Sequence, residues 1–260
     1  MRENDLIKLK EKLIEIKAMG WIQNRRQGNA GGVGNTLEDL LDVAENNLQL
    51  PDFGAWELKS QRSDTGSLLT LFHVEPEPRR ARIVPRILLP FYGWPHQEAG
   101  TTYPATEKSF RQTINTTNCS DRGFKVNVDR INECIFVTFD YTRIDDRHAD
   151  WRRFIITGIG TSDVSPNPYW SFSTISNKLE NKINNLLYFK AERKTENGIE
   201  FFKYNQFEAY TDPSLEKFLQ LMEQGYLYID FDARTGHNHG TKFRIKPLKK
   251  NELYANQVEA

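Results

Sequence analysis

The sequence predicts an α/β or α+β protein in which helices pack against a β-sheet. Its elements run from two helices through a series of strands to alternating helices and strands, an order typical of such folds. The chain has 260 residues, of which 38% are hydrophobic and 27% are charged. This composition suffices for one large core or two modest lobes, and it excludes an intrinsically disordered chain.

The composition also excludes several classes of protein. No apolar run reaches the roughly 18 to 20 residues that a membrane span needs. Residues 1–17 alternate charged side chains with Leu and Ile, unlike a signal peptide. We therefore expect a soluble cytoplasmic protein with no membrane partner. Cys119 and Cys134 are the only cysteines, which excludes a disulfide framework and a four-cysteine zinc module. One disulfide stays open as an alternative, but we expect reduced thiols.

The N-terminal part of the chain predicts two helices. Residues 4–19 place Leu and Ile at near-helical spacing. A basic loop with four glycines and two arginines follows at 24–35. Residues 36–48 then predict the second helix, with Asn35 or Thr36 as its N-cap.

The rest of the chain predicts mainly strands. Residues 76–118 contain many prolines and arginines in an irregular pattern, which indicates a long exposed loop rather than a core element. The predicted helices cover 173–187 and 214–224. The predicted strands cover 52–60, 67–74, 123–129, 133–141, 153–159, 188–193, 201–210, 226–233 and 241–246.

The most informative segment runs from Asp52 to Lys59. On a strand, Glu57 and Lys59 point to the same face, while Leu58 between them points into the core. Asp52 precedes them closely enough to share a cation with Glu57. Two carboxylates can hold Mg²⁺ through oxygen, and a lysine can hold a phosphate or orient an attacking water. These groups suit the hydrolysis of phosphodiester bonds.

The Glu-x-Lys tripeptide alone carries little information. It also occurs at 15–17, 180–182 and 192–194. Two of these copies lie in predicted helices, where residues i and i+2 do not share a face, and the third has no Pro-Asp ahead of it. On spacing alone, a solvated strand face therefore stays open as the alternative to a nuclease site.

The charges are distributed unevenly, although 35 basic and 35 acidic residues leave a formal net charge of zero. Residues 36–64 contain seven acids and two bases. Residues 76–130 contain nine Lys or Arg and five acids, and residues 234–250 contain six with no acid. An acidic centre between basic stretches fits a metal-dependent enzyme that acts on a polyanion, although ordinary surface scatter can produce the same pattern.

Five segments of the chain carry a resemblance to a known family. The run 34–41 followed by 51–59 resembles the MutH-like branch of the PD-(D/E)xK nucleases, with Glu38 on the helix before the Asp…Glu-x-Lys strand. More narrowly, segments 67–73, 169–172 and 237–245 are similar to segments of the MvaI/BcnI restriction endonucleases, in the same order over nearly the whole chain.

This resemblance implies a PD-(D/E)xK core, with a mixed β-sheet flanked by helices, and a DNA-recognition lobe. It implies a monomeric type II restriction endonuclease that cuts double-stranded DNA at a CC-N-GG-type site and uses Mg²⁺, for which Mn²⁺ can substitute. Asp52, Glu57 and the main-chain carbonyl of Leu58 would bind the metal. Lys59 would orient the phosphate and the attacking water, and Glu38 would be an auxiliary carboxylate.

Several residues outside this segment are candidates for DNA binding. Strand alternation after Gly240 places Lys242 and Arg244 on an outward face, with a histidine pair on the preceding turn. An outward arginine can read guanine in the major groove. A solvated basic edge strand or a His-x-His metal site are the alternatives for this segment. The full candidate set comprises His237, His239, Lys242, Arg244, Arg234, Arg25, Arg26 and His73.

The implied organisation has two lobes. A catalytic lobe would comprise 1–75 and roughly 170–210, and a recognition lobe with extensions would comprise 76–169 and 211–260. A cognate DNA methyltransferase would accompany the enzyme without a stable complex. Two other functions stay open: a MutH-like mismatch-repair nicking endonuclease and a non-catalytic DNA-binding module.

Overall fold

A computed structural model describes residues 2–26, 28, 31–43 and 51–258. By its contacts the chain divides into two compact units. The first comprises Met1–Leu69, Asn177–Ser214 and Lys250–Ala260, and the second comprises Thr70–Ser176 and Leu215–Lys249. None of the described helices is long and apolar enough to span a membrane.

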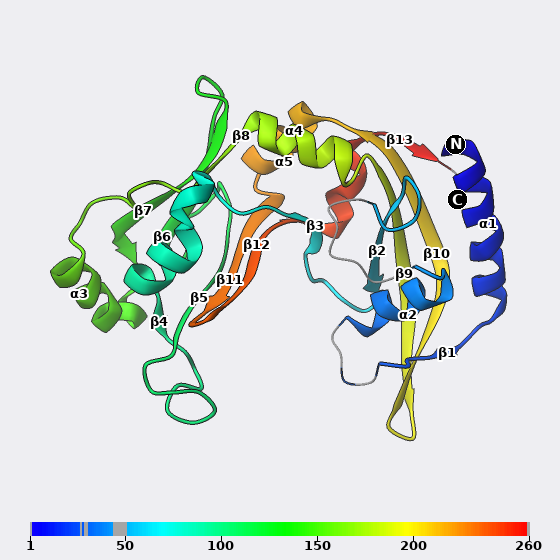
Figure 1. The fold of residues 1–260 in the computed structure, drawn as a ribbon, viewed down its shortest axis with the longest axis horizontal. Helices are drawn as coiled ribbons and strands as arrows, with labels where there is room; N and C mark the ends of the chain where they lie inside the picture. Colours follow the sequence, from blue (N-terminus) through cyan, green and yellow to red (C-terminus); the bar gives the residue numbers. More distant parts are fainter. Residues whose placement is uncertain (1, 27, 29–30, 44–50, 259–260) are drawn as a thin grey trace. The chain divides into compact units, whose positions relative to one another are not determined.

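The first unit contains a mixed five-stranded sheet (Figure 1). Its path runs β1–β10–β9–β2, with β13 also pairing with β10. Strand β9 is antiparallel to β10 and parallel to β2, which confirms the expected mixed sheet with helices. The strands are β1 (Ile22–Gln23), β2 (Glu57–Arg62), β9 (Asn185–Glu196), β10 (Ile199–Pro213) and β13 (Tyr254–Val258).

Helices α1 (Arg2–Ala18) and α2 (Gly32–Leu40) pack against this sheet. Leu9 and Leu13 of α1 and Leu37 of α2 share a buried cluster with Leu58 of β2. Burial of such side chains stabilises the fold by about 1.5 to 3 kcal/mol each. Both ends of the described chain therefore contact the same sheet: α1, at the N-terminal end, packs against it, and β13, at the C-terminal end, is one of its strands.

Helix α2 begins earlier than the sequence predicts. It starts at Gly32 rather than after Asn35 or Thr36, and residues 44–48 of the predicted helix lie outside the described residues. The glycines permit close packing, because a Cβ on Gly32 would lie 2.5 Å from Asn24 Nδ2. The sequence predicts a later start because glycine has a low helix propensity. Here the close packing of Gly32 against Asn24 outweighs that low propensity.

The second unit contains two sheets. One has the order β3–β12–β11–β5–β4 and the other β6–β7–β8. The first sheet comprises β3 (Leu69–His73), β4 (Trp94–Pro95), β5 (Lys108–Ile114), β11 (Leu227–Arg234) and β12 (His237–Ile245). The second comprises β6 (Arg122–Asp129), β7 (Cys134–Ile144) and β8 (Tyr169–Ser171). Aromatic rings from both sheets fill the core of this unit. For example, the Phe110 ring lies edge-on to the rings of both Phe124 and Phe231.

Two sequence predictions for this unit are wrong. Residues 153–158 belong to helix α3 (Ala149–Gly158) and Ile159 caps it, so the segment is not a strand; Trp151 and Ile155 are buried one helical turn apart. Residues 76–118 are not an exposed loop. They include the π-helix η2 (Val84–Tyr92) and strand β5, and Val84 and Phe110 are fully buried.

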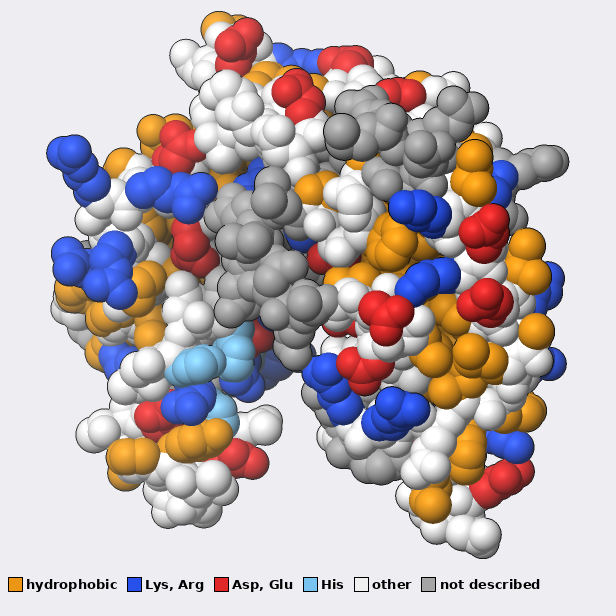
Figure 2. Space-filling model, turned by 45° about the vertical axis from the view of Figure 1, so that its right-hand side comes forward, with side chains coloured by type: hydrophobic (Ala, Val, Ile, Leu, Met, Phe, Trp, Pro, Cys, Tyr) orange, Lys and Arg blue, Asp and Glu red, His pale blue; other side chains and the backbone are white. Residues whose placement is uncertain are grey.

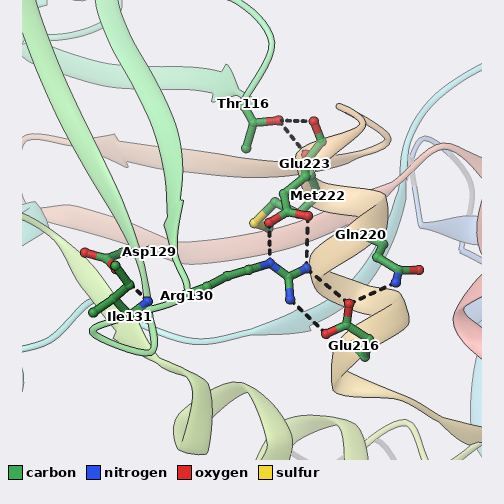
Figure 3. A network of polar contacts seen from close by, with 8 residues as sticks. All are labelled: Thr116, Asp129, Arg130, Ile131, Glu216, Gln220, Met222 and Glu223. Atoms are coloured by element: carbon green, nitrogen blue, oxygen red, sulfur yellow. Dashed lines mark hydrogen bonds and ion pairs between the residues drawn. The ribbon is translucent and has the colours of Figure 1, made fainter.

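The remaining helical segments are α4 (Phe172–Asn181), α5 (Leu215–Glu223), η1 (Arg79–Ala81), η3 (Asp146–His148) and η4 (Pro247–Leu253). The β6–β7 hairpin is tied to α5 through Arg130 (Figure 3). This guanidinium donates to Glu223 and Glu216, whose carboxylates raise the pKa of Arg130 above its ordinary value. Because all three side chains are exposed, salt screens these contacts strongly.

Candidate active site

The candidate active site is centred on Glu57, the first residue of β2. A tight turn precedes it, in which Phe53 and Trp56 exchange backbone hydrogen bonds of 2.9 and 2.8 Å. Gly54 in this turn has a φ of 55°, a conformation that glycine adopts without strain. The turn brings Asp52 back beside the strand, where its Oδ2 accepts a hydrogen bond of 3.0 Å from the Leu58 amide.

Strand alternation places Glu57 and Lys59 on one side of β2. The Lys59 ammonium donates to Glu57 Oε1, while Leu58 packs into the core against the helices. The Glu57 side chain is only 1% exposed. A carboxylate this deeply buried needs compensating cations, because an unpaired buried charge is strongly destabilising.

A second lysine completes the cluster. Lys182 follows directly after α4 and precedes β9, which runs parallel to β2 with Leu186 opposite Glu57. Its Nζ lies 2.7 Å from Glu57 Oε2 and 3.5 Å from Asp52 Oδ1. Asp52, Glu57, Lys59 and Lys182 thus form one group, here called the carboxylate–lysine cluster. Sequence reasoning missed Lys182, because its Glu-x-Lys tripeptide carries no distinguishing signal.

Burial dominates the electrostatics of the cluster. Desolvation of its carboxyl raises the pKa of Glu57 above its ordinary value of 4.5. Lys59 and Lys182 counter this shift, whereas Asp52 adds to it through like-charge repulsion. The two ammonium groups therefore partly offset the cost of keeping a charged carboxylate in this position.

The cluster can accommodate a cation between two carboxylates. Asp52 and Glu57 each direct an oxygen toward the same ammonium, that of Lys182. No group of three His, Cys, Asp or Glu side chains in the described ranges is close enough to form a metal site. Mg²⁺ commonly binds one or two carboxylates and completes its coordination with water and substrate phosphates. The donor set thus fits a hard divalent cation more closely than zinc.

Glu38, the expected auxiliary carboxylate, lies on α2. A Cβ on Gly34 would lie 3.2 Å from Ser60 Oγ and 4.0 Å from Glu38 Oε1. Gly34 of α2 therefore lies next to both Ser60 of β2 and the Glu38 carboxylate.

The candidate DNA-reading strand β12 carries paired cations. Phe243 and Ile245 are fully buried, and Lys242 and Arg244 lie on the other face, as predicted. Lys242 Nζ lies 2.8 Å from Asp232, and Arg244 Nη1 lies 3.1 Å from Asp230 on the neighbouring strand β11. The sequence pattern did not reveal these acidic partners.

The histidine pair is not on a turn as expected. His237 and His239 lie within β12, with ring centroids 4.2 Å apart, and the turn precedes them at Gly236. Arg234 at the end of β11 forms an ion pair of 3.0 Å with Glu107.

The other candidates for DNA binding lie at separate places. Arg25 and Arg26 follow β1 in the first unit, and Arg26 Nη2 lies 3.0 Å from Asp39. Residues 27, 29 and 30 of the predicted basic loop lie outside the described residues. His73 ends β3 in the second unit and is exposed. On the face shown in Figure 2, basic and acidic side chains are interspersed, in agreement with the net charge of zero.

The chain is similar to known restriction endonucleases over nearly its whole length. The profile of the MvaI/BcnI restriction endonuclease family matches residues 10–254. A solved complex of restriction endonuclease MvaI with its cognate DNA substrate is similar to this chain, with a TM-score of 0.76 and 28% identity over 97% of each chain. MvaI in the absence of DNA gives a TM-score of 0.51 and 27% identity, over 98% of this chain and 96% of that one. No curated protein sequence matches significantly.

Proposed function

The chain belongs to the MvaI/BcnI restriction endonuclease family and is a site-specific nuclease, and on that premise we propose that it hydrolyses double-stranded DNA at a CC-N-GG-type site with Mg²⁺. The carboxylate–lysine cluster is the observation that carries this proposal. It combines a buried carboxylate, a second carboxylate that reaches the same cation, and two lysines.

The residues of the cluster have different roles in the proposed reaction. Asp52, Glu57 and the main-chain carbonyl of Leu58 would hold Mg²⁺ or Mn²⁺, and the hydrogen bond from the Leu58 amide holds the Asp52 carboxylate in place. A divalent cation there supplies positive charge that stabilises the scissile phosphate. Lys59 orients the phosphate and the attacking water, and Glu38 acts as an auxiliary carboxylate.

We assign catalysis to the first unit and most of the base reading to the second. The first unit holds the cluster together with Arg25 and Arg26, and the second holds the other DNA-binding candidates. Lys242, Arg244 and Arg234 would exchange their acidic partners for DNA acceptors, as cations that read bases do through bidentate bonds. His237, His239 and His73 would contact the same duplex. We expect the enzyme to act as a monomer, beside a host methyltransferase with which it forms no stable complex.

A cleavage experiment tests this proposal. The purified protein is incubated with a plasmid of known sequence in Mg²⁺, Mn²⁺, Ca²⁺ or a chelator, and the ends are mapped. We expect double-strand cuts confined to CC-N-GG-type sites, with Mg²⁺ or Mn²⁺ only. Full activity in the chelator would contradict the metal assignment. Nicked circles alone would favour the MutH-like alternative, and binding without any cleavage would favour a non-catalytic module.

A further inference from the structure

Four arginines form an exposed group in the second unit. Arg79, Arg80, Arg82 and Arg86, here called the arginine group, lie within two consecutive helical turns and are all exposed. The Arg86 amide donates a hydrogen bond of 2.9 Å to the Arg82 carbonyl. Neighbouring Ile83 and Val84 are buried, at 1% and 0% exposure, so the backbone that carries the group is anchored in the core.

The arginine group differs from the other arginines of its unit. The remaining nine all contact an acidic group or an aromatic ring: Arg111, Arg122, Arg130, Arg143, Arg147, Arg152, Arg153, Arg234 and Arg244. Within the described ranges, no side chain of the arginine group forms an ion pair or a hydrogen bond. The four arginines of the unit without such a contact thus lie within eight residues of one another along the chain.

The acids closest in sequence, Glu75 and Glu77, form their hydrogen bonds with residues outside the arginine group. Glu77 accepts hydrogen bonds from Thr174 Oγ1 at 2.6 Å and Ser171 Oγ at 3.2 Å. Glu75 accepts from the Thr241 amide at 2.9 Å. Residues 78–97 contain no Asp or Glu at all.

Such an arrangement costs stability unless an anion binds to it. Like charges a few residues apart lie within the Debye length of about 8 Å at physiological salt, so they repel one another. Exposed guanidinium groups match phosphate oxygens in a bidentate geometry, and phosphate contacts hold a duplex without reading its sequence. A solvated surface is the alternative, and it predicts no effect on DNA binding.

We propose that the arginine group is a clamp for the phosphate backbone of duplex DNA. This inference rests on the proposed function, because that function supplies the polyanion. The clamp contributes affinity equally for all sequences, and it leaves the choice of base pairs to other residues.

The salt dependence of DNA binding tests the clamp. Binding of a fluorescent duplex is measured between 50 and 200 mM salt, without Mg²⁺, for the wild type and for a variant carrying Arg79→Gln, Arg80→Gln, Arg82→Gln and Arg86→Gln. The slope of log K against log salt is negative, and each lost phosphate contact makes it shallower by about 0.9. We expect the slope of the fourfold variant to be shallower than that of the wild type by about 2 to 4, with the base preference unchanged.

A matched control uses two other exposed arginines of the unit. The variant Arg143→Gln/Arg153→Gln removes cations that already have Asp140 and Asp150 beside them, so its slope should equal that of the wild type. A wild-type slope in the fourfold variant, or a changed base preference, overturns the clamp while leaving the proposed function intact. Failure of the wild type to bind any duplex overturns both. Circular dichroism melting of each variant verifies that it is folded.

Discussion

Replacing Lys182 by Met tests whether the buried carboxylate depends on its second lysine. The substitution keeps a side chain of similar length and removes one of the two ammonium groups that contact Glu57. Lys182 is 17% exposed and Glu57 is 1% exposed, so the pair is largely shielded from water. We therefore expect the variant to be less stable than the wild type at neutral pH.

The magnitude follows from the geometry. Two unit charges about 4 Å apart interact by about 4 kcal/mol at an effective dielectric constant of about 20. Desolvation of the lysine offsets part of this energy, and Lys59 still compensates Glu57 in the variant. A lost hydrogen bond to a buried charge typically costs about 1 to 3 kcal/mol, and we expect the loss to fall in that range.

A double-mutant cycle isolates this interaction. The free energy of unfolding is measured by urea denaturation for the wild type, Lys182→Met, Glu57→Gln and the double variant. With Glu57 neutral, Lys182→Met should cost less than about 0.5 kcal/mol, which gives a coupling energy of about 0.5 to 3 kcal/mol. Lys203→Met is the control, since Lys203 lies on β10 in the same unit and forms no ion pair among the described residues, although Glu192 lies opposite it on β9.

One result would refute this reasoning. If Lys182→Met destabilises the protein equally in the wild-type and Glu57→Gln backgrounds, the two side chains do not interact energetically. The effect would then come from packing alone, and Lys182 would have no place in the cluster.

Three further predictions concern the other charged groups. Glu57→Ala or Lys59→Ala should abolish plasmid cleavage but leave specific DNA binding nearly intact; cleavage within a few-fold of wild type would contradict the assignment. Arg244→Ala should cost roughly 1 to 3 kcal/mol of specific binding and relax the preference at one G·C pair, as a competition assay with single-base variants would reveal. A uniform loss over all sequences would instead indicate a phosphate contact. Burial raises the pKa of Asp232, but the hydrogen bond from Lys242 and the nearby charges of Lys242, His239 and Arg111 together outweigh burial and hold that pKa below its ordinary value of 3.8. The resulting stabilisation is present above pH 3.8 and is lost as the pH falls through the lowered pKa. Thermal melting should therefore show Asp232→Asn to be less stable than wild type at pH 7, with a smaller difference at pH 3; an equal difference at both would argue against the ion pair.

The sequence by itself determined the features that depend on neighbours along the chain. Glu57 and Lys59 share a face because strand alternation has a period of two, whatever the rest of the fold does. The same rule placed Phe243 in the core and Lys242 outside it. The order of the elements predicted a sheet with helices, and ordered motifs along the chain indicated the family.

The tertiary structure alone decided which distant groups meet. Lys182 reaches Glu57 only because β9 lies parallel to β2, and no local pattern encodes that pairing. Asp232 and Asp230 of β11 neutralise Lys242 and Arg244 because β11 and β12 form an antiparallel hairpin, a pairing that the alternation within β12 does not reveal. The short apolar run at 153–159 is compatible with a strand or a helix, and packing selects the helix by burying Ile155. Burial and ion pairing depend on contacts between remote segments, so charge states in the site follow from the fold rather than from spacing along the chain.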